Sequence, residues 1–160
     1  MPADDEARAA AGPSGPSRPD RPGWMAVLAR TGTDSLEEAL RSLDPPPHWT
    51  RLRGPETGMV MVRGRIGGDG APFNLGEMTV VRCAVTLSCG TTGHAYVAGR
   101  DGRRAELAAV CDALLQTDAA PLLHDRLIAP ERARQRAART DALRRAAATR
   151  VEFLGLARMG

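Results

Sequence analysis

The middle of the chain, residues 56–101, holds three runs of alternating or β-branched residues separated by glycine clusters. That pattern predicts consecutive strands joined by turns. In the first run, one parity predicts a buried face made of Val60, Val62 and Ile66. The opposite parity is apolar and then cationic, with Met59, Met61, Arg63 and Arg65. This strand should therefore bury one face and present the other.

The second and third runs predict the rest of an antiparallel sheet. Alternate residues from Thr79 to Leu87, with Cys83 among them, form the predicted buried side of the second strand, and Arg82 lies opposite. In the third run, residues 93–99, alternation places His94, Tyr96 and Ala98 on one side of the strand and Ala95 and Val97 on the other. Residues 48–53, which follow three prolines, are predicted to be an edge strand. The sheet should have three to four strands.

Helical spacing brackets this sheet on both sides. Trp24, Val27 and Leu28 predict a short helix, and Thr33 or Asp34 is the predicted N-cap of a second helix. After the sheet, Asp101 should cap a helix whose inward residues are Leu107, Val110, Cys111, Leu114 and Leu115. The fold class is therefore α+β, with a small antiparallel sheet flanked by helices.

A last helix is predicted from Pro130 to about residue 158, on the order of 40 Å long. Its apolar stripe comprises Leu143, Ala147, Val151 and Leu154. The predicted sheet is too small to cover so long a helix, so part of it should lie on another chain.

Composition separates a tail from one domain. Residues 1–22 are rich in Ala, Gly, Pro, Ser and charge and predict a disordered tail, which leaves residues 23–160 as a single domain. The first residues are acidic and lack an apolar core, so they do not predict a signal peptide, and no run reaches membrane-spanning length. An odd set of cysteines, Cys83, Cys89 and Cys111, favours reduced thiols. We therefore expect a cytoplasmic protein that does not contact membranes.

All 22 basic residues are arginine, which excludes lysine chemistry. The chain can supply neither a P-loop lysine nor a Schiff-base lysine. Aromatic residues make up only 3% of the chain, so the core must depend on Val, Leu, Ala and Met. Such a lean core predicts that some apolar surface meets a partner.

Candidate binding groups are cationic, and each has a plain alternative. Arg63, Arg65 and Arg82, with Gly67 and Gly68 in a glycine cluster, could contact a phosphate or carboxylate. The alternative is an ordinary hairpin turn beside a solvated or partner-facing sheet.

The last helix carries a second cationic set, Arg132, Arg136 and Arg139, which could track nucleic acid. Scarce aromatic residues and interrupting acids favour a partner-facing helix instead. The three histidines lack metal-ligand spacing, and no nucleophile has a base at a recognisable spacing. We therefore predict no catalytic residue and no metal site in this chain.

An ordered set of short motifs resembles a known family. The motifs are W-M-x-V-L-A at 24–29, P-E-T-G at 55–58, G-R-I-G-G-x-G at 64–70, G-R-D at 99–101, D-A-L-L-Q at 112–116 and R-V-E-F-L at 150–154. Together they are similar to the PhnG family, the G subunit of the bacterial carbon–phosphorus lyase system. The resemblance runs from residue 24 to about residue 156.

The resemblance implies a role in phosphonate degradation. It implies partners, namely the H, I and J subunits of the core complex, with L or K subunits of the ATP-binding-cassette type. With H, I and L, the G subunit would be required to transfer ribose triphosphate from ATP to methylphosphonate with release of adenine. The complex would use ATP with Mg, and S-adenosylmethionine with an iron–sulfur cluster in the J subunit. No cofactor is expected in this chain.

Three hypotheses follow. The first is a structural or allosteric subunit whose partner interface includes Met59, Met61, Leu143, Val151 and Leu154. The second is an enzyme subunit whose Arg63, Arg65 or Arg82 reaches the substrate in a shared site. The third is a free-standing nucleic-acid-binding or adaptor protein that uses the arginines of the last helix.

Overall fold

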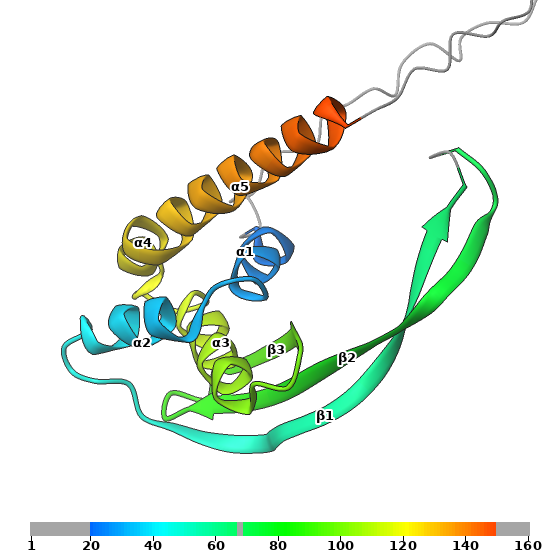
Figure 1. Ribbon diagram of the computed structural model, residues 1–160. Coiled ribbons are helices and arrows are strands. Elements are labelled where there is room, and N and C mark those ends of the chain that lie inside the picture. The colour runs from blue at the N-terminus through cyan, green and yellow to red at the C-terminus, as the bar shows by residue number, and fades with distance from the viewer. Residues whose placement is uncertain (1–19, 67–68, 150–160) are drawn as a thin grey trace, which may run out of the picture.

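A three-stranded antiparallel sheet carries helices on one face (Figure 1) in the computed structural model, which describes residues 20–66 and 69–149. In chain order the elements are α1 (Arg21–Leu28), α2 (Thr33–Arg41), β1 (Trp49–Arg65), β2 (Pro72–Leu87), β3 (Thr92–Ala98), α3 (Gly102–Leu114), α4 (Ala120–Leu123), the π-helical turn η1 (His124–Ile128) and α5 (Ala129–Ala148). The predicted α+β class, with a long C-terminal helix, is confirmed.

The sheet has the order β1-β2-β3, so β1 is an edge strand and β2 is central. The two predicted runs at 48–53 and 59–66 form one strand, and no fourth strand is present among the described residues. Register shifts between Arg51 and Glu56 absorb Gly54 and Pro55. A proline lacks the backbone N–H that a ladder needs, and an edge strand with a bulge tolerates that loss.

Helix α3 is the centre of the core. Every residue from Ala105 to Leu114 is buried, because the sheet covers one side of α3 and the other helices cover the rest. The five predicted inward residues are buried, and so are the predicted β2 residues from Val81 to Leu87. At Gly93 a Cβ atom would collide with the Ala109 carbonyl oxygen of α3, so β3 lies in close contact with the helix.

The predicted cap of α2 was wrong. Gly32 occupies the N-cap position, and no side chain bonds to the first turn. The Thr33 hydroxyl instead donates to Asp101 Oδ2 at 2.9 Å, while Asp101 Oδ1 accepts from the Arg104 backbone N–H at 2.9 Å. The prediction that Asp101 caps α3 is confirmed. The Thr33 hydroxyl therefore makes a tertiary hydrogen bond that joins the starts of α2 and α3, and it does not cap its own helix.

Two further predictions need adjustment at the edges of elements. Strand β2 ends at Leu87, so Cys89 lies beyond the strand and is exposed in the following turn. Ile66, predicted to be buried, is 74% exposed, and Val60 and Val62 of the same predicted face are only half-buried, because no element that the structure describes covers this end of β1. Helix α1 begins at Arg21, inside the predicted tail, with Asp20 as its N-cap. Pro130 lies in the first turn of α5 as predicted, and positions 150–158 of the predicted helix lie outside the described residues.

Candidate functional site

Strands β1 and β2 extend beyond the sheet as a two-stranded arm, defined here as residues 58–65 and 72–79. The third strand pairs with β2 only between Val80 and Thr86, whereas β1 pairs with β2 as far as Arg65 and Pro72. The arm extends past the helices and bends toward the side of the sheet on which they lie (Figure 1). Within the described residues it therefore has no third strand beside it.

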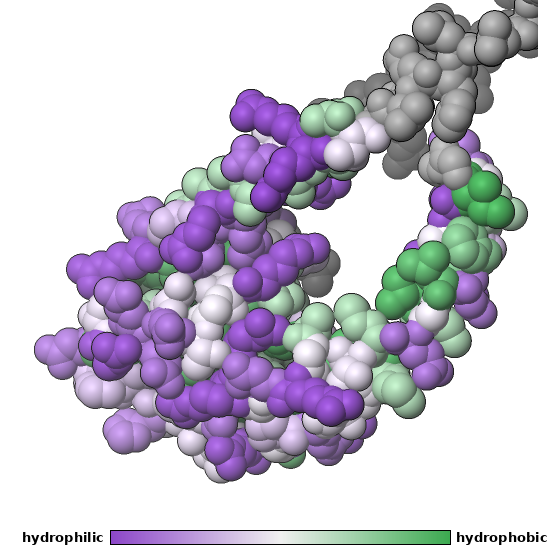
Figure 2. Space-filling model, viewed as in Figure 1, coloured by the Kyte–Doolittle hydropathy of each residue, from purple (hydrophilic) through white to green (hydrophobic). Residues whose placement is uncertain are grey.

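The arm concentrates exposed apolar side chains. Among the described residues, ten large hydrophobic side chains are exposed, and six of these lie on the arm or its turn: Met59, Met61, Ile66, Phe73, Leu75 and Met78. In Figure 2, hydrophobic surface (green) gathers along the arm between hydrophilic groups (purple), whereas the surface over the helices is mostly hydrophilic. A register shift after Val62 leaves Leu75 as an extra residue, 66% exposed.

This arm has the physical properties of an unfilled interface. An isolated two-stranded ribbon is at best marginally stable in water. Its outer edges present unpaired backbone groups, and contiguous exposed apolar patches mark interaction sites on soluble proteins. Methionine is unbranched and polarizable, so Met59, Met61 and Met78 can adapt to a partner surface. A binding partner would supply the missing cover.

The structure places the predicted interface residues in different regions. Met59 and Met61 are 68% and 52% exposed on the arm, opposite Thr79 and Glu77. Leu143 is 61% exposed on α5. Val151 and Leu154 lie outside the described residues, as do Gly67 and Gly68 of the glycine cluster.

The three candidate arginines do not form one patch. Arg63 lies opposite Asn74 in the β1–β2 register, near the end of the arm. Arg65 Nη1 donates to the Gly70 carbonyl at 3.1 Å. Arg82 lies eight residues from Asn74 along β2, or about 26 Å at strand rise. There it bonds Glu56, with Nη2 to Oε2 at 2.9 Å. Arg82 is thus neutralised at the base of the arm.

A small pocket of about 200 Å³ lies beside Arg82 and is also lined by Arg53, His94 and Tyr96. It combines two guanidinium groups with a phenol and an imidazole. Glu56 also faces Arg53, with a 3.6 Å separation between Nε and Oε1. Because the single carboxylate of Glu56 pairs with both arginines, it balances only one of their two positive charges and already engages both guanidinium groups.

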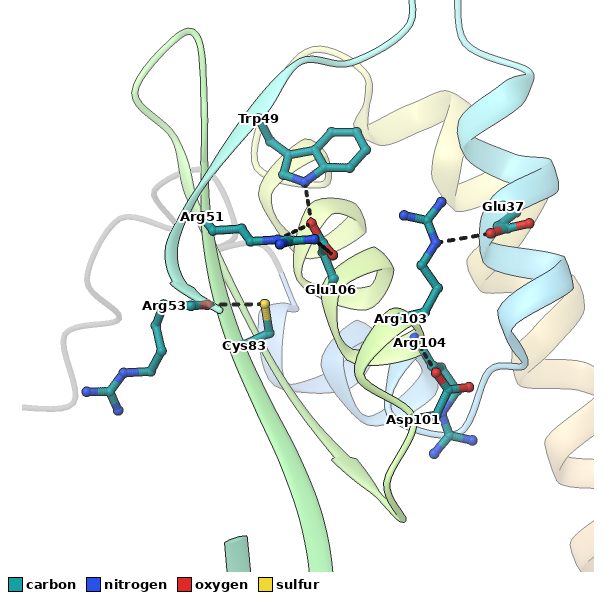
Figure 3. A network of polar contacts seen from close by, with 9 residues as sticks. All are labelled: Glu37, Trp49, Arg51, Arg53, Cys83, Asp101, Arg103, Arg104 and Glu106. Atoms are coloured by element: carbon teal, nitrogen blue, oxygen red, sulfur yellow. Dashed lines mark hydrogen bonds and ion pairs between the residues drawn. The ribbon is translucent and has the colours of Figure 1, made fainter. Parts of the chain in front are cut away.

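Two buried carboxylates on α3 were missed by the sequence analysis. Glu106 is 4% exposed. Its carboxylate accepts hydrogen bonds from Nε and Nη2 of Arg51, both at 2.8 Å, and from the Trp49 indole N–H at 2.9 Å (Figure 3). Despite its burial, these bonds, with Arg51 foremost, hold the pKa of the Glu106 carboxyl below its usual range. Glu106 therefore stays ionised and ties β1 to α3.

Asp112 repeats this arrangement for α1. It is fully buried and accepts Arg21 Nη2 at 2.7 Å, the Trp24 indole N–H at 2.9 Å and the His94 backbone N–H at 2.9 Å. The available signal was a pair of carboxylates within the otherwise apolar run from Ala105 to Leu114, with tryptophans elsewhere that could donate to them. Both carboxylates are committed to structural donors, which makes them poor general acids or bases.

The two buried thiols give no support for nucleophilic catalysis. Burial raises the pKa of the Cys111 thiol to about 12, and burial also raises the pKa of Cys83, whose Sγ donates to the Arg53 carbonyl at 3.3 Å. A buried thiol with a raised pKa is a poor nucleophile. Hydrogen bonding to Thr91 lowers the pKa of exposed Cys89, which lies in a turn.

Metal-binding clusters and membrane-spanning helices are both absent from the residues that the structure describes. Within residues 20–66 and 69–149, no group of three or more His, Cys, Asp or Glu side chains is placed to hold a metal ion. Over the same residues, no helix combines the length and the apolar character needed to cross a membrane.

Comparison with known proteins gives a consistent result. The sequence profile of the family described as "Phosphonate metabolism protein PhnG" matches residues 19–159. A curated protein of Rhizobium meliloti (strain 1021) is 46% identical over 138 residues, which cover 84% of this chain and 86% of that protein. That relative is named alpha-D-ribose 1-methylphosphonate 5-triphosphate synthase subunit PhnG. The match spans the arm, the α3 carboxylates and α5 alike, and the chain belongs to the PhnG family of phosphonate metabolism proteins.

Proposed function

We propose that this chain is a structural or allosteric subunit of an alpha-D-ribose 1-methylphosphonate 5-triphosphate synthase. Its role would be to assemble, with the H, I and L subunits, the machinery that transfers ribose triphosphate from ATP to methylphosphonate and releases adenine. The name of the 46% identical relative supports the synthase, and the family description supports phosphonate metabolism. The proposed setting is the cytoplasm.

The apolar arm is the observation that carries the structural role. A subunit that reacts by itself needs a nucleophile, an acid–base pair or a metal. The two buried carboxylates, Glu106 and Asp112, accept structural hydrogen bonds, and burial raises the pKa of the Cys111 thiol. A subunit that organises others needs a surface that is incomplete alone. The exposed side chains of Met59, Met61 and Leu75 provide that surface.

Finer assignments follow from the same proposal. The H, I and J subunits would form the core around this chain, with an L or K subunit associating with that core. ATP with Mg, and S-adenosylmethionine with an iron–sulfur cluster in J, would be bound by other subunits. The lysine-free sequence supports this division, because phosphate loops of the P-loop type depend on a lysine.

Co-expression with the I subunit tests the proposal. The two chains should elute together in size-exclusion chromatography at low salt, and they should stay together at about 0.5 M salt, because apolar contacts are not screened. Separate elution at low salt would reject the structural role. A preparation of this chain alone that turned over methylphosphonate would reject its non-catalytic character.

A further inference from the structure

A cationic pocket lies between the end of α1 and one face of α5, and no residue of the arm lines it. Its volume is about 400 Å³. Its lining consists of four arginines and one glutamine: Arg30, Arg132, Gln135, Arg136 and Arg139. We call this the arginine pocket. Three of its arginines, Arg132, Arg136 and Arg139, form the cationic set that the sequence predicts on the last helix.

Helical spacing and one cross-helix bond build the arginine pocket. Arg132, Arg136 and Arg139 occupy positions i, i+4 and i+7 of α5, so they lie along one face of the helix. Gln135 Nε2 donates to the Val27 carbonyl at 3.1 Å, which fixes that face against the C-terminal turn of α1. Arg30 follows α1 directly and contributes from the other side.

Charge in the arginine pocket is poorly balanced. The one acidic group in ion-pair contact with it, within the described chain, is Asp20, whose Oδ2 is 3.6 Å from Arg132 Nη2 and whose side chain is 68% exposed. Arg30 Nη1 donates to the Ala26 carbonyl at 2.9 Å. Arg136 and Arg139 make no ion pair with any residue that the structure describes.

Two other arginines of α5 form ion pairs in the way typical of a solvated helix. Arg134 Nη1 lies 3.0 Å from Glu131 Oε1, and Arg144 Nη1 lies 3.7 Å from Asp141 Oδ1. The arginine pocket lacks such internal partners at two of its positions. Several like charges around one hollow repel each other, and an anion placed between them would relieve that repulsion.

We infer that the arginine pocket binds a condensed phosphate, such as the triphosphate chain of a nucleotide or of a sugar triphosphate. Guanidinium forks match phosphate oxygens in bidentate geometry. The arginine stripe on α5 spans about 10 Å, the scale of one short phosphate chain. No aromatic residue lines the pocket to stack a base, which disfavours single-stranded nucleic acid. The choice of a triphosphate rests on the proposed function, whereas the preference for a multivalent anion rests on the pocket.

Isothermal titration of the full chain with inorganic tripolyphosphate at low ionic strength tests this inference. The Arg136→Ala/Arg139→Ala variant should bind about tenfold more weakly or worse, because it removes two charge-assisted contacts. The matched control is Arg144→Ala/Arg145→Ala, which removes the same charge from the same helix outside the pocket and should bind like the wild type. Affinity should fall as salt is added. Undetectable binding by the wild type, or equal losses in both variants, would overturn the inference.

A second readout works even when the chain is purified together with partner subunits. Phenylglyoxal modifies accessible arginines, and peptide mass spectrometry reports the site. Tripolyphosphate should protect Arg136 and Arg139 and leave Arg144 unprotected, and unchanged labelling at the first two would contradict the inference. If a single-stranded RNA oligonucleotide outcompeted tripolyphosphate at these sites, the inference of phosphate binding would be wrong, and nucleic-acid binding would take its place. Co-elution with the I subunit, measured on the same variants, should stay intact, which separates this inference from the proposed assembly role.

Discussion

Replacing Met59 and Met61 with glutamine should weaken association with partner subunits about 100-fold or more. Glutamine is close to methionine in length, so the substitution changes polarity with little change of shape. Each buried apolar side chain contributes about 1.5–3 kcal/mol, and two of them account for that factor. Both side chains are more than half exposed in the free chain, so its melting temperature should not change. Affinity would be measured by titrating the purified I subunit.

A matched control separates the arm from apolar exposure in general. Leu52 lies on the same strand outside the arm and is 61% exposed. Leu52→Gln should therefore bind partners like the wild type. Equal weakening by Leu52→Gln would show that exposure alone, rather than the arm, decides association. Full affinity of the Met59→Gln/Met61→Gln variant would remove these two methionines from the interface.

Replacing Asp112 with alanine should lower the free energy of unfolding by about 3–5 kcal/mol. The change would leave the Arg21 guanidinium, the Trp24 indole N–H and the His94 backbone N–H without their acceptor. The bond from the Trp24 indole lies in the buried interior, where an unmade hydrogen bond is most expensive, and the other two are partly buried. Helix α1 would lose its polar anchor to α3. Denaturant unfolding monitored by tryptophan fluorescence provides the measurement.

Two further variants sharpen the interpretation of Asp112→Ala. Asp118 is exposed beyond the end of α3, and Asp118→Ala should change stability by less than about 0.5 kcal/mol. Asp112→Asn keeps an oxygen acceptor and the side-chain volume, so its loss should fall between those of the two alanine variants. A loss below about 1 kcal/mol for Asp112→Ala would show that the network contributes little.

Local patterns predicted the core well where local and tertiary preferences agree. The alternation of β2 from Val81 to Leu87 identified its buried side, because β3 and α3 do pack there. The Asp101 cap was predictable because its acceptor bond joins residues only three apart. The long C-terminal helix and the exposure of Met59 and Met61 were also visible from the sequence.

Long-range polar contacts were not predictable in the same way. Arg21 and Asp112 are 91 residues apart, and nothing local marks them as partners. The apolar residues of the arm alternate like those of a core strand, so periodicity predicted burial for Ile66, which the described fold leaves exposed. The alternation of apolar and polar residues indicates that a strand face is to be buried, but it does not indicate whether the same chain or a partner buries it.

Hydrogen exchange of the arm, compared between the free chain and its assembly with the I subunit, tests the central claim most directly. The account predicts that peptides covering residues 58–65 and 72–79 exchange rapidly in the free chain and at least about tenfold more slowly after assembly. Peptides from α3, buried in both states, should not change. Arm exchange that is unaltered by assembly would contradict the account, because the apolar arm would then remain uncovered in the complex.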